Sequence, residues 1–415
     1  MPGDALDFRP LAAEDWDRWY RNLEVAFGGS EDFPEDRELW RELTELDRSV
    51  GVWDGDHPVG GASAFSFRMA VPGGAVVPAA GVTMVGVLPT HRRRGVLSRL
   101  MRDQLDEVRR RGEALAVLTA SESLIYGRFG YGLGTWRMGV TVPRRVGLRA
   151  PVDRSVRLRL VAPESVVAAC EELYAELVPH RPGMLARQPG WEKLPLKDPA
   201  GGREGASPLQ CVVAEDRESG QLLGYARYAV AMDWNASDIA DGTVRVRDLE
   251  ARTPGVRAAL VEFLLGLDLT GRVRFRSRPV DDALLHLVDD PRRLEPQLVD
   301  SMYVRLVELG AALEQRGYAA PVDVVLEVSD AFCPWNAGRW RLHSDGPGKG
   351  ASCVRTEAAA DLALDVRELG AAYLGGVRLT ALAAAGLVTE LRDGALTETT
   401  RAFASDVAPW LPHGF

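Results

Sequence analysis

Lysine and cysteine are scarce in this 415-residue sequence, and a long apolar run is missing. Arginine supplies nearly all of the 50 basic residues, because lysine occurs only at Lys193, Lys197 and Lys349. This bias indicates a GC-rich genome rather than a function. The four cysteines lie far apart with no C-x-x-C spacing, which argues against a zinc site or a disulfide framework and for a reduced, cytosolic setting. No apolar run reaches the roughly 18 residues that span a membrane.

Other signatures are absent as well. The first residues, MPGDALDFRPLAAEDW, carry acids where a signal peptide carries a basic patch and an apolar core. There is no G-x-x-x-x-G-K-[ST] motif for a nucleoside triphosphate, no G-x-G-x-x-G after a strand, and no H-E-x-x-H among the six histidines. The net charge of -9 repels nucleic acid and anionic lipid. We therefore expect no metal, no nucleic-acid partner and no membrane partner, and a small-molecule substrate that is an amine.

Composition and spacing predict several globular domains. Hydrophobic residues make up 46% of the chain and charged residues 26%. Helix-like and strand-like segments alternate, and VGLRAPVDRSVRL, residues 146–158, predicts a linker. We expect a mixed α+β and α/β fold with domains at 1–150, 151–298 and 299–415, the second a diverged duplicate of the first. In the third domain, SDGPGKGASCVRTEAAAD, residues 344–361, predicts a surface loop.

The stretch VGVLPTHRRRGVLSRLM, residues 85–101, points to an anion site. An apolar strand meets a Pro-Thr turn, three arginines and Gly95, and then becomes a helix. The next strand, ALAVLT, makes this a parallel pair with a right-handed crossover. The first N–H groups of such a helix lack partners and its dipole is positive there, while glycine allows close approach. Because Arg92, Arg93 and Arg94 add charge that can grip phosphate, the stretch predicts a pyrophosphate site.

A solvated helix start is the alternative interpretation of the three arginines. Arginine at a helix N-terminus is unfavourable with the dipole unless an anion binds there, so the misfit favours a function. His91 is a candidate base by position, but we expect a turn or surface role for it. Trp16, Trp19, Trp40 and Trp53 are expected mostly in the core, although Trp40 or Phe27 could line an acceptor pocket.

The same stretch resembles the acyl-CoA-binding motif of the GNAT acetyltransferases, in which a strand feeds an R-x-x-G-x turn and a helix. Downstream, LTASESLIYGRFGYG, residues 118–132, and the tail that ends in Phe415 resemble the Eis-like (enhanced intracellular survival) acetyltransferases. Chains of that family pair two GNAT-like domains with a C-terminal sterol-carrier-protein-like domain, and the resemblance spans the whole chain. One departure is Leu97, where GNAT proteins often carry glycine or alanine.

The resemblance implies a site on the first domain. It implies that acetyl-CoA, the co-substrate, is held at Val85, Gly86, Val87, Arg92, Arg93, Arg94, Gly95, Val96 and Ser121. It also implies that the Tyr126 hydroxyl protonates the leaving thiolate and that the terminal carboxylate of Phe415 takes a proton from the amine. From the residues alone, Tyr126 is a packed aromatic and a C-terminal residue is most often frayed. With a pKa of about 3.5, an α-carboxylate is a weak base that acts through water or by holding the ammonium.

Three functions stay open. The first is an acetyl-CoA-dependent N-acetyltransferase in the cytoplasm, a hexamer by resemblance, that acts on an aminoglycoside, a polyamine or a lysine side chain. The alternative is a lipid- or ligand-binding protein that works through its C-terminal sterol-carrier-like module and has vestigial GNAT domains. A third is an acyltransferase that uses a longer acyl-CoA. In the second domain the matching turn has a single arginine before Pro254, which has no N–H to donate, so we expect this copy to bind no cofactor and to wall the pocket.

Overall fold

Strands from three separate stretches of the chain form the first sheet of the computed structural model, which describes residues 6–415. The strand order is β1-β2-β3-β4-β5-β15-β6, and β9 also pairs with β3. The strands are β1 (Asp7–Pro10), β2 (Val50–Asp54), β3 (His57–Ala70), β4 (Val76–Val87), β5 (Leu115–Thr119), β6 (Gly132–Leu133), β9 (Leu185–Ala186) and β15 (Met302–Leu306). The predicted parallel pair is confirmed in β4 and β5. Segments distant in sequence therefore complete the sheet that carries the predicted site.

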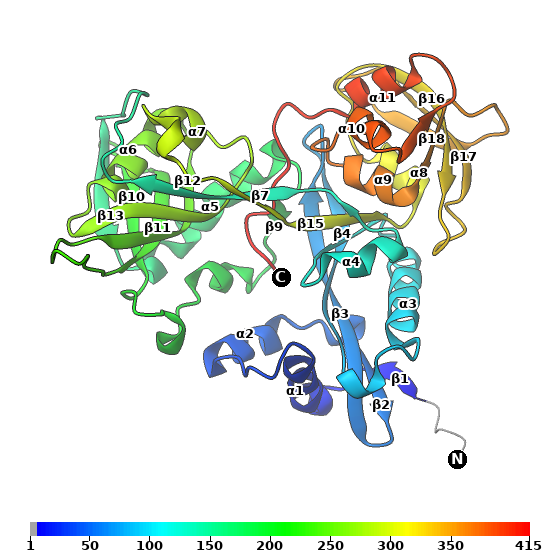
Figure 1. Ribbon diagram of the computed structural model, residues 1–415, viewed down its shortest axis with the longest axis horizontal. Helices are drawn as coiled ribbons and strands as arrows, with labels where there is room; N and C mark the ends of the chain where they lie inside the picture. The colour runs from blue at the N-terminus through cyan, green and yellow to red at the C-terminus, as the bar shows by residue number, and fades with distance from the viewer. Residues whose placement is uncertain (1–5) are drawn as a thin grey trace. The chain divides into compact units, whose positions relative to one another are not determined.

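Within residues 6–135 four helices accompany this sheet: α1 (Trp16–Ala26), α2 (Pro34–Leu43), α3 (Val96–Arg110) and α4 (Ser123–Tyr126). The helix α1 contacts β3 and β4, and the Trp19 indole N–H donates to the Val50 carbonyl at 3.2 Å. The helix α3 lies along β3, β4 and β5 (Figure 1). Its apolar stripe is buried, since Leu100, Met101 and Leu105 are each at most 2% exposed. Burial of this stripe fixes the helix whose N-terminus was predicted to bind an anion.

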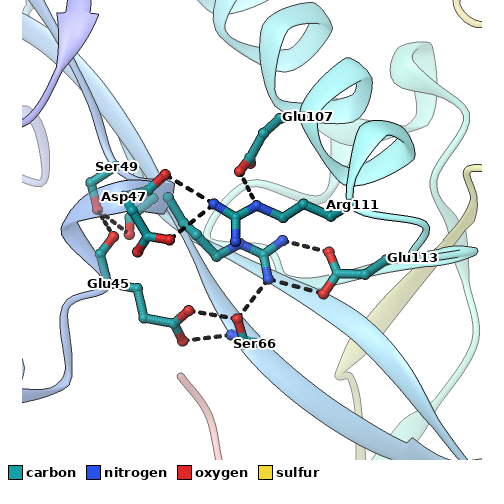
Figure 2. A network of polar contacts seen from close by, with 9 residues as sticks. Glu45, Asp47, Ser49, Ser66, Glu107, Arg111 and Glu113 are labelled. Carbon is teal, nitrogen blue, oxygen red and sulfur yellow. Dashed lines mark hydrogen bonds and ion pairs between the residues drawn. The ribbon is translucent and has the colours of Figure 1, made fainter.

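A buried polar network fixes the other end of α3 (Figure 2). The Arg48 guanidinium donates to both carboxylate oxygens of Glu113, at 2.9 and 2.6 Å, and to the Ser66 hydroxyl at 2.8 Å. Ser66, on β3, in turn donates its backbone N–H to Glu45 at 2.6 Å. Because a bidentate arginine–carboxylate pair fixes both distance and orientation, the network holds the C-terminal end of α3 against β3.

A second compact unit comprises residues 136–179 and 187–299, while the first takes in the described residues up to Thr135 together with His180–Ala186 and Asp300–Phe415. The second sheet has the order β14-β7-β13-β12-β11-β10-β8. Its strands are β7 (Trp136–Pro143), β8 (Val156–Val161), β10 (Gln210–Asp216), β11 (Leu222–Ala231), β12 (Gly242–Ala251), β13 (Thr270–Arg278) and β14 (Gln297–Asp300). The described helices are α5 (Val167–Leu177), α6 (Pro254–Leu265) and α7 (Leu284–Leu287). The parallel pair of β12 and β13 around α6 repeats the pattern of β4, α3 and β5.

The remaining chain forms a five-stranded sheet in the order β18-β17-β16-β19-β20. Its elements are α8 (Leu309–Glu314), β16 (Val322–Ser329), β17 (Gly338–Ser344), β18 (Ala351–Arg355), β19 (Leu362–Asp365), α9 (Val366–Ala372), α10 (Leu379–Ala384), β20 (Val388–Glu390) and α11 (Ala395–Phe403). The prediction of a surface loop at 344–361 is wrong in part, because β18 pairs with β17. As the edge strand it buries mainly Cys353 and leaves Val354 55% exposed, so its apolar signal is weak.

No helix in residues 6–415 is long and apolar enough to cross a membrane. Within the same range, no group of three or more histidine, cysteine, aspartate or glutamate side chains is arranged to hold a metal ion. All four cysteines are free thiols and buried.

Candidate functional site

The site begins where β4 and β5 separate. The two strands pair only at Ala80–Ala116 and Gly81–Val117, although β4 continues to Val87. The register of β3 against β4 also shifts here, and Met84 adopts a φ of 51°, which produces a bulge in β4. Beyond Gly81, the edge of β4 that would face β5 is therefore open, and its backbone N–H and C=O groups are available to a ligand.

The helix α3 starts beside this open edge. Gly95, its N-cap residue, has a φ of 79°, and within the described chain no side chain caps the helix. A Cβ at Gly95 would meet nothing within 4 Å, so the glycine is required by its left-handed conformation and leaves the space in front of the helix empty. The first turn carries no acidic residue. The first N–H groups of the helix, which no side chain caps, and the positive end of the dipole therefore face an open space, an arrangement that favours an anion such as phosphate.

A cavity of about 560 Å³ occupies this space. Its lining includes the predicted cofactor residues Val85, Gly86, Val87, Arg92, Arg93, Gly95, Val96 and Ser121. The remaining predicted residue, Arg94, is exposed and does not belong to this lining. His91 also lines the cavity, and its ring lies 3.1 Å from an oxygen of Asp54 and 2.8 Å from the Thr90 hydroxyl. The two arginines and the helix N-terminus give this cavity the chemistry that a pyrophosphate needs.

The two lining arginines differ in how they are held. The Arg92 guanidinium donates to the backbone carbonyls of Val87 and Ala26, at 3.4 and 3.3 Å, so it ties β4 to α1. Arg93 has a φ of 62°, in the left-handed region that costs a non-glycine residue energy. Backbone strain of this kind persists where the surrounding structure imposes it. Here the left-handed conformation of Arg93 turns the chain sharply into α3.

A second cavity of about 300 Å³ adjoins the first. It is lined by Tyr20, Leu23, Glu24, Phe27, Ser30, Asp32, Trp40, Val82, Thr83, Met84, Val85, Thr119, Ser121, Tyr126 and Phe415. Phe27, Val85, Ser121 and Tyr126 line both cavities, so the two meet at these residues. Aromatic rings and two acidic side chains in one lining suit a molecule that carries positive charge.

The two carboxylates are held differently. Glu24 accepts from Arg37 Nη1 at 3.1 Å through both oxygens, so its charge is compensated within the protein. Asp32 accepts from the Tyr20 hydroxyl at 2.5 Å. Burial first, and then this hydrogen bond, hold the pKa of Tyr20 well above its usual value, so the Tyr20 hydroxyl stays a neutral donor to Asp32. Tyr20, Glu24 and Asp32 were not predicted as site residues. In the sequence, Tyr20 belongs to the apolar spacing of a predicted helix, and Glu24 and Asp32 are polar positions on and after that helix.

Tyr126 lies where the cavities meet. It ends α4, and its ring packs edge-on against Tyr131, with 6.0 Å between ring centres. Burial, and then the charge of Glu122, raise the pKa of Tyr126 to about 12. The phenol therefore keeps its proton at neutral pH and can donate it.

Phe415 is inserted into the second cavity. Its ring meets Phe67 of β3 edge-on at 4.9 Å between ring centres, and a Cβ at Gly81 would lie 3.2 Å from the Phe415 ring. The end of the described chain is thus packed on β3 and β4. Trp40 and Phe27, the aromatic candidates for an acceptor pocket, line the same cavity.

Three segments of the chain match known domain families. Residues 7–134 and residues 183–306 each match a family model described as an acetyltransferase (GNAT) domain, and residues 309–412 match one described as a sterol carrier protein domain. The expected fold, two GNAT-type domains followed by a sterol-carrier-like domain, is confirmed.

Full-length relatives match as well. An uncharacterized N-acetyltransferase of Streptomyces avermitilis is 60% identical over 411 residues, which cover 99% of both chains. The N-acetyltransferase Eis of Mycobacterium bovis is 37% identical over 411 residues, or 94% of this chain and 96% of the relative. The crystal structure of Eis1 from Mycobacterium abscessus superposes with a TM-score of 0.84 at 33% identity and covers 99% of this chain and all of that one.

Proposed function

The chain belongs to the Eis-like family of GNAT N-acetyltransferases, and from this premise we propose that it moves the acetyl group of acetyl-CoA to an amine of a cationic small molecule. The observation that carries the proposal is the junction of the two cavities at Tyr126. One cavity offers a helix N-terminus and arginines to phosphate, and the other offers aromatic rings and carboxylates to a cation. An aminoglycoside, a polyamine or a lysine side chain fits this second description.

The residues of the first cavity fit acetyl-CoA, which would supply the thioester whose acetyl group moves. Gly95 and the start of α3 would hold the pyrophosphate, with Arg92, Arg93 and Arg94 adding charge around it. Val85, Gly86 and Val87 on the open edge of β4 would bond the pantetheine amides, beside Ser121.

Two groups of the chain would move protons. The Tyr126 hydroxyl, neutral because of its raised pKa, would give its proton to the departing sulfur. The carboxylate of Phe415, the last residue of the sequence, would take a proton from the attacking amine through water. The ring of Phe415 against Phe67 would hold that carboxylate in the acceptor cavity.

The interior of the C-terminal module weighs against the lipid-binding alternative. Arg316, only 2% exposed, donates to the backbone carbonyls of Tyr373 and Phe403 at 2.5 and 2.8 Å, and its guanidinium lies over the rings of Tyr318 and Phe403. A cation buried among these aromatic rings is a poor neighbour for an apolar ligand. We therefore propose that this module supports the catalytic domain, in a cytoplasmic and hexameric enzyme as the family resemblance implies.

The direct test is release of free thiol from acetyl-CoA against a panel of an aminoglycoside, a polyamine and a lysine peptide, with a neutral alcohol as control. We expect release only with amines. Asp32→Asn should raise KM for a polycationic acceptor roughly tenfold or more, because a charge-assisted contact is lost, and leave the Kd of acetyl-CoA unchanged. Glu31→Gln is the matched control, since Glu31 is 74% exposed and absent from the lining. Thiol release that no amine accelerates would contradict the proposal.

The role of Phe415 has its own test. A tag after Phe415 replaces the carboxylate with a neutral amide and adds chain to a filled cavity, so it should abolish most acetyl transfer, as should deletion of Phe415. A tag before the first residue should have no effect. Acetyl-CoA should bind to all of these variants, because the arginine turn is unchanged. Full turnover by the C-terminally tagged enzyme would remove Phe415 from the mechanism.

A further inference from the structure

Residues His180–Ala186 belong to the first compact unit, although residues on both sides of them belong to the second. Their backbone extends the first sheet. β9 pairs with the end of β3, with Leu185 opposite Met69. Ala70 donates to the Met184 carbonyl at 2.9 Å and accepts from the Gly183 N–H at 2.8 Å. This segment, called the strap below, is therefore bonded to the strand that also carries Phe67.

The other side of the strap is bonded to the C-terminal tail. Arg181 Nη1 donates to the Ala408 carbonyl at 2.6 Å, and the Trp410 N–H donates to the Pro182 carbonyl at 2.9 Å. Gly183 has a φ of 89°, and a Cβ there would lie 3.1 Å from the carbonyl oxygen and 3.2 Å from the amide nitrogen of Trp410. The left-handed conformation and the close backbone approach both require glycine.

The tail is thus held at two points on the same strand. Trp410, 4% exposed, is tied to β3 through the strap, and Phe415 packs on Phe67 of β3 directly. Five residues span at most about 18 Å when fully extended, so the anchor at Trp410 limits where the chain end can lie. Phe415 packs on β3 through the ring of Phe67, whereas the strap is joined to the tail by backbone bonds.

We propose that the strap positions the C-terminal tail so that Phe415 stays in the acceptor cavity, with Arg181 and Gly183 as its positioning residues. The inference rests on the proposed function only for the consequence in turnover. In this proposal the strap, which is far from Tyr126 in sequence, contributes to the reaction. It fixes the distance between the carboxylate of Phe415 and the residues where the two cavities meet.

Amide hydrogen exchange of the peptide 405–415, read by mass spectrometry on the full chain, tests the strap without any substrate. Gly183→Ala should raise exchange there more than tenfold, because the new methyl group meets Trp410 and the left-handed residue is strained. Gly220→Ala is the matched control, since Gly220 has a φ of 71° and a Cβ there would meet nothing within 4 Å. If both variants exchange like the unmodified protein, the strap does not hold the tail and the proposal is overturned.

Arg181→Ala covers the case in which Gly183→Ala fails to fold. It removes one hydrogen bond from a charged donor, so exchange in 405–415 should rise roughly tenfold, and Arg181→Lys should restore part of the protection. Unchanged exchange in Arg181→Ala, together with unchanged exchange in any folded Gly183→Ala, overturns the proposal.

Turnover separates this inference from the proposed function. Gly183→Ala should lower kcat about tenfold in the full chain and less than twofold further in a chain that lacks Phe415, because the two changes act through one group. Raised exchange with unchanged kcat upholds the strap and removes the carboxylate of Phe415 from the mechanism. Raised exchange with equal losses of kcat in both backgrounds upholds the strap and shows that it acts on turnover through another part of the tail.

Discussion

The two GNAT-type copies in this chain start their central helices differently, and the difference shows what a binding site requires. In the first copy, α3 begins at Val96 after the N-cap Gly95, within the described chain no side chain caps it, and a cavity lies in front of it. In the second, Thr253 accepts from the Val256 N–H at 3.3 Å and Pro254 occupies the first helical position. The second helix thus satisfies or removes the donors that the first leaves open.

The two copies also differ in the space between the two parallel strands beside the central helix, which is open in the first copy and filled in the second. In the second copy β12 and β13 pair as far as Val246 and Phe275, and Arg278 follows on β13. Arg278 Nη1 donates to the Leu249 carbonyl at 3.1 Å, and its Nε donates to Asp282 at 2.7 Å. The side chain of Arg278 therefore bonds to the edge of β12 that corresponds to the open edge of β4. A buried arginine stands in the second copy where the first has room for a ligand.

The largest expected effect lies at Tyr126, at the junction of the two cavities of the first copy. Tyr126→Phe keeps the ring but removes the proton donor, so kcat should fall by about 10²- to 10⁴-fold while the Kd of acetyl-CoA stays the same. Tyr131→Phe is the control, because the Tyr131 hydroxyl is buried, makes no hydrogen bond among the described residues and lines neither cavity.

The pH dependence sharpens this prediction. Burial raises the pKa of Tyr126 to about 12, so its hydroxyl stays protonated from about pH 7 to about pH 10 and turnover should not fall in that window through this group. A loss of kcat near pH 9 that disappears in Tyr126→Phe would show that the phenol ionises earlier and would contradict the assignment.

The next effect concerns the stability of the second copy. Arg278→Ala would remove the buried guanidinium that lies against Glu250 and Asp282, 6% and 2% exposed, and leave only Arg257, 3.6 Å from Asp282, of the two arginines at this cluster, which should lower the free energy of unfolding by about 3 kcal/mol. Arg93→Ala, at the exposed turn of the first copy, should leave stability within about 0.5 kcal/mol. Urea denaturation of both variants checks the contrast. Equal stabilities would show that Arg278 is no structural replacement for a ligand.

A smaller effect is expected for cofactor binding in the first copy. Arg93→Ala should weaken the Kd of acetyl-CoA roughly 10- to 100-fold, as loss of one charge-assisted phosphate contact does, and Arg92→Ala with Arg93→Ala should weaken it further. Arg94→Ala separates a side-chain contact from general charge, since Arg94 lies outside the cavity lining. Calorimetry measures all three. Equal losses in Arg93→Ala and Arg94→Ala would mean that only the net charge of the turn matters.

The sequence was sufficient to predict which residues of one continuous segment line the first cavity. Residues 85–96 contain the end of a strand, a turn with Gly95 and the start of a helix. These features are adjacent in sequence, so residue spacing and helix electrostatics predict them. The acceptor cavity is different, because Tyr20, Asp32 and Phe415 come together only through tertiary packing. The strap and β15 join the first sheet from far along the chain. The apolar pattern of β9 and of β15 does not indicate which strand each one pairs with.

The last prediction concerns the second copy, where we expect no binding of acetyl-CoA. Calorimetric titration should give one acetyl-CoA per chain, because α6 is capped by Thr253 and Arg278 bonds to the edge of β12. Pro254→Ala restores the missing N–H without moving Arg278, so its stoichiometry should also stay at one. A value of two for the unmodified protein would show that the second copy binds despite its filled gap. A stoichiometry of two for Pro254→Ala alone would show that Pro254, and not Arg278, prevents the second copy from binding acetyl-CoA. A single N–H donor at the helix N-terminus would then decide which copy binds phosphate.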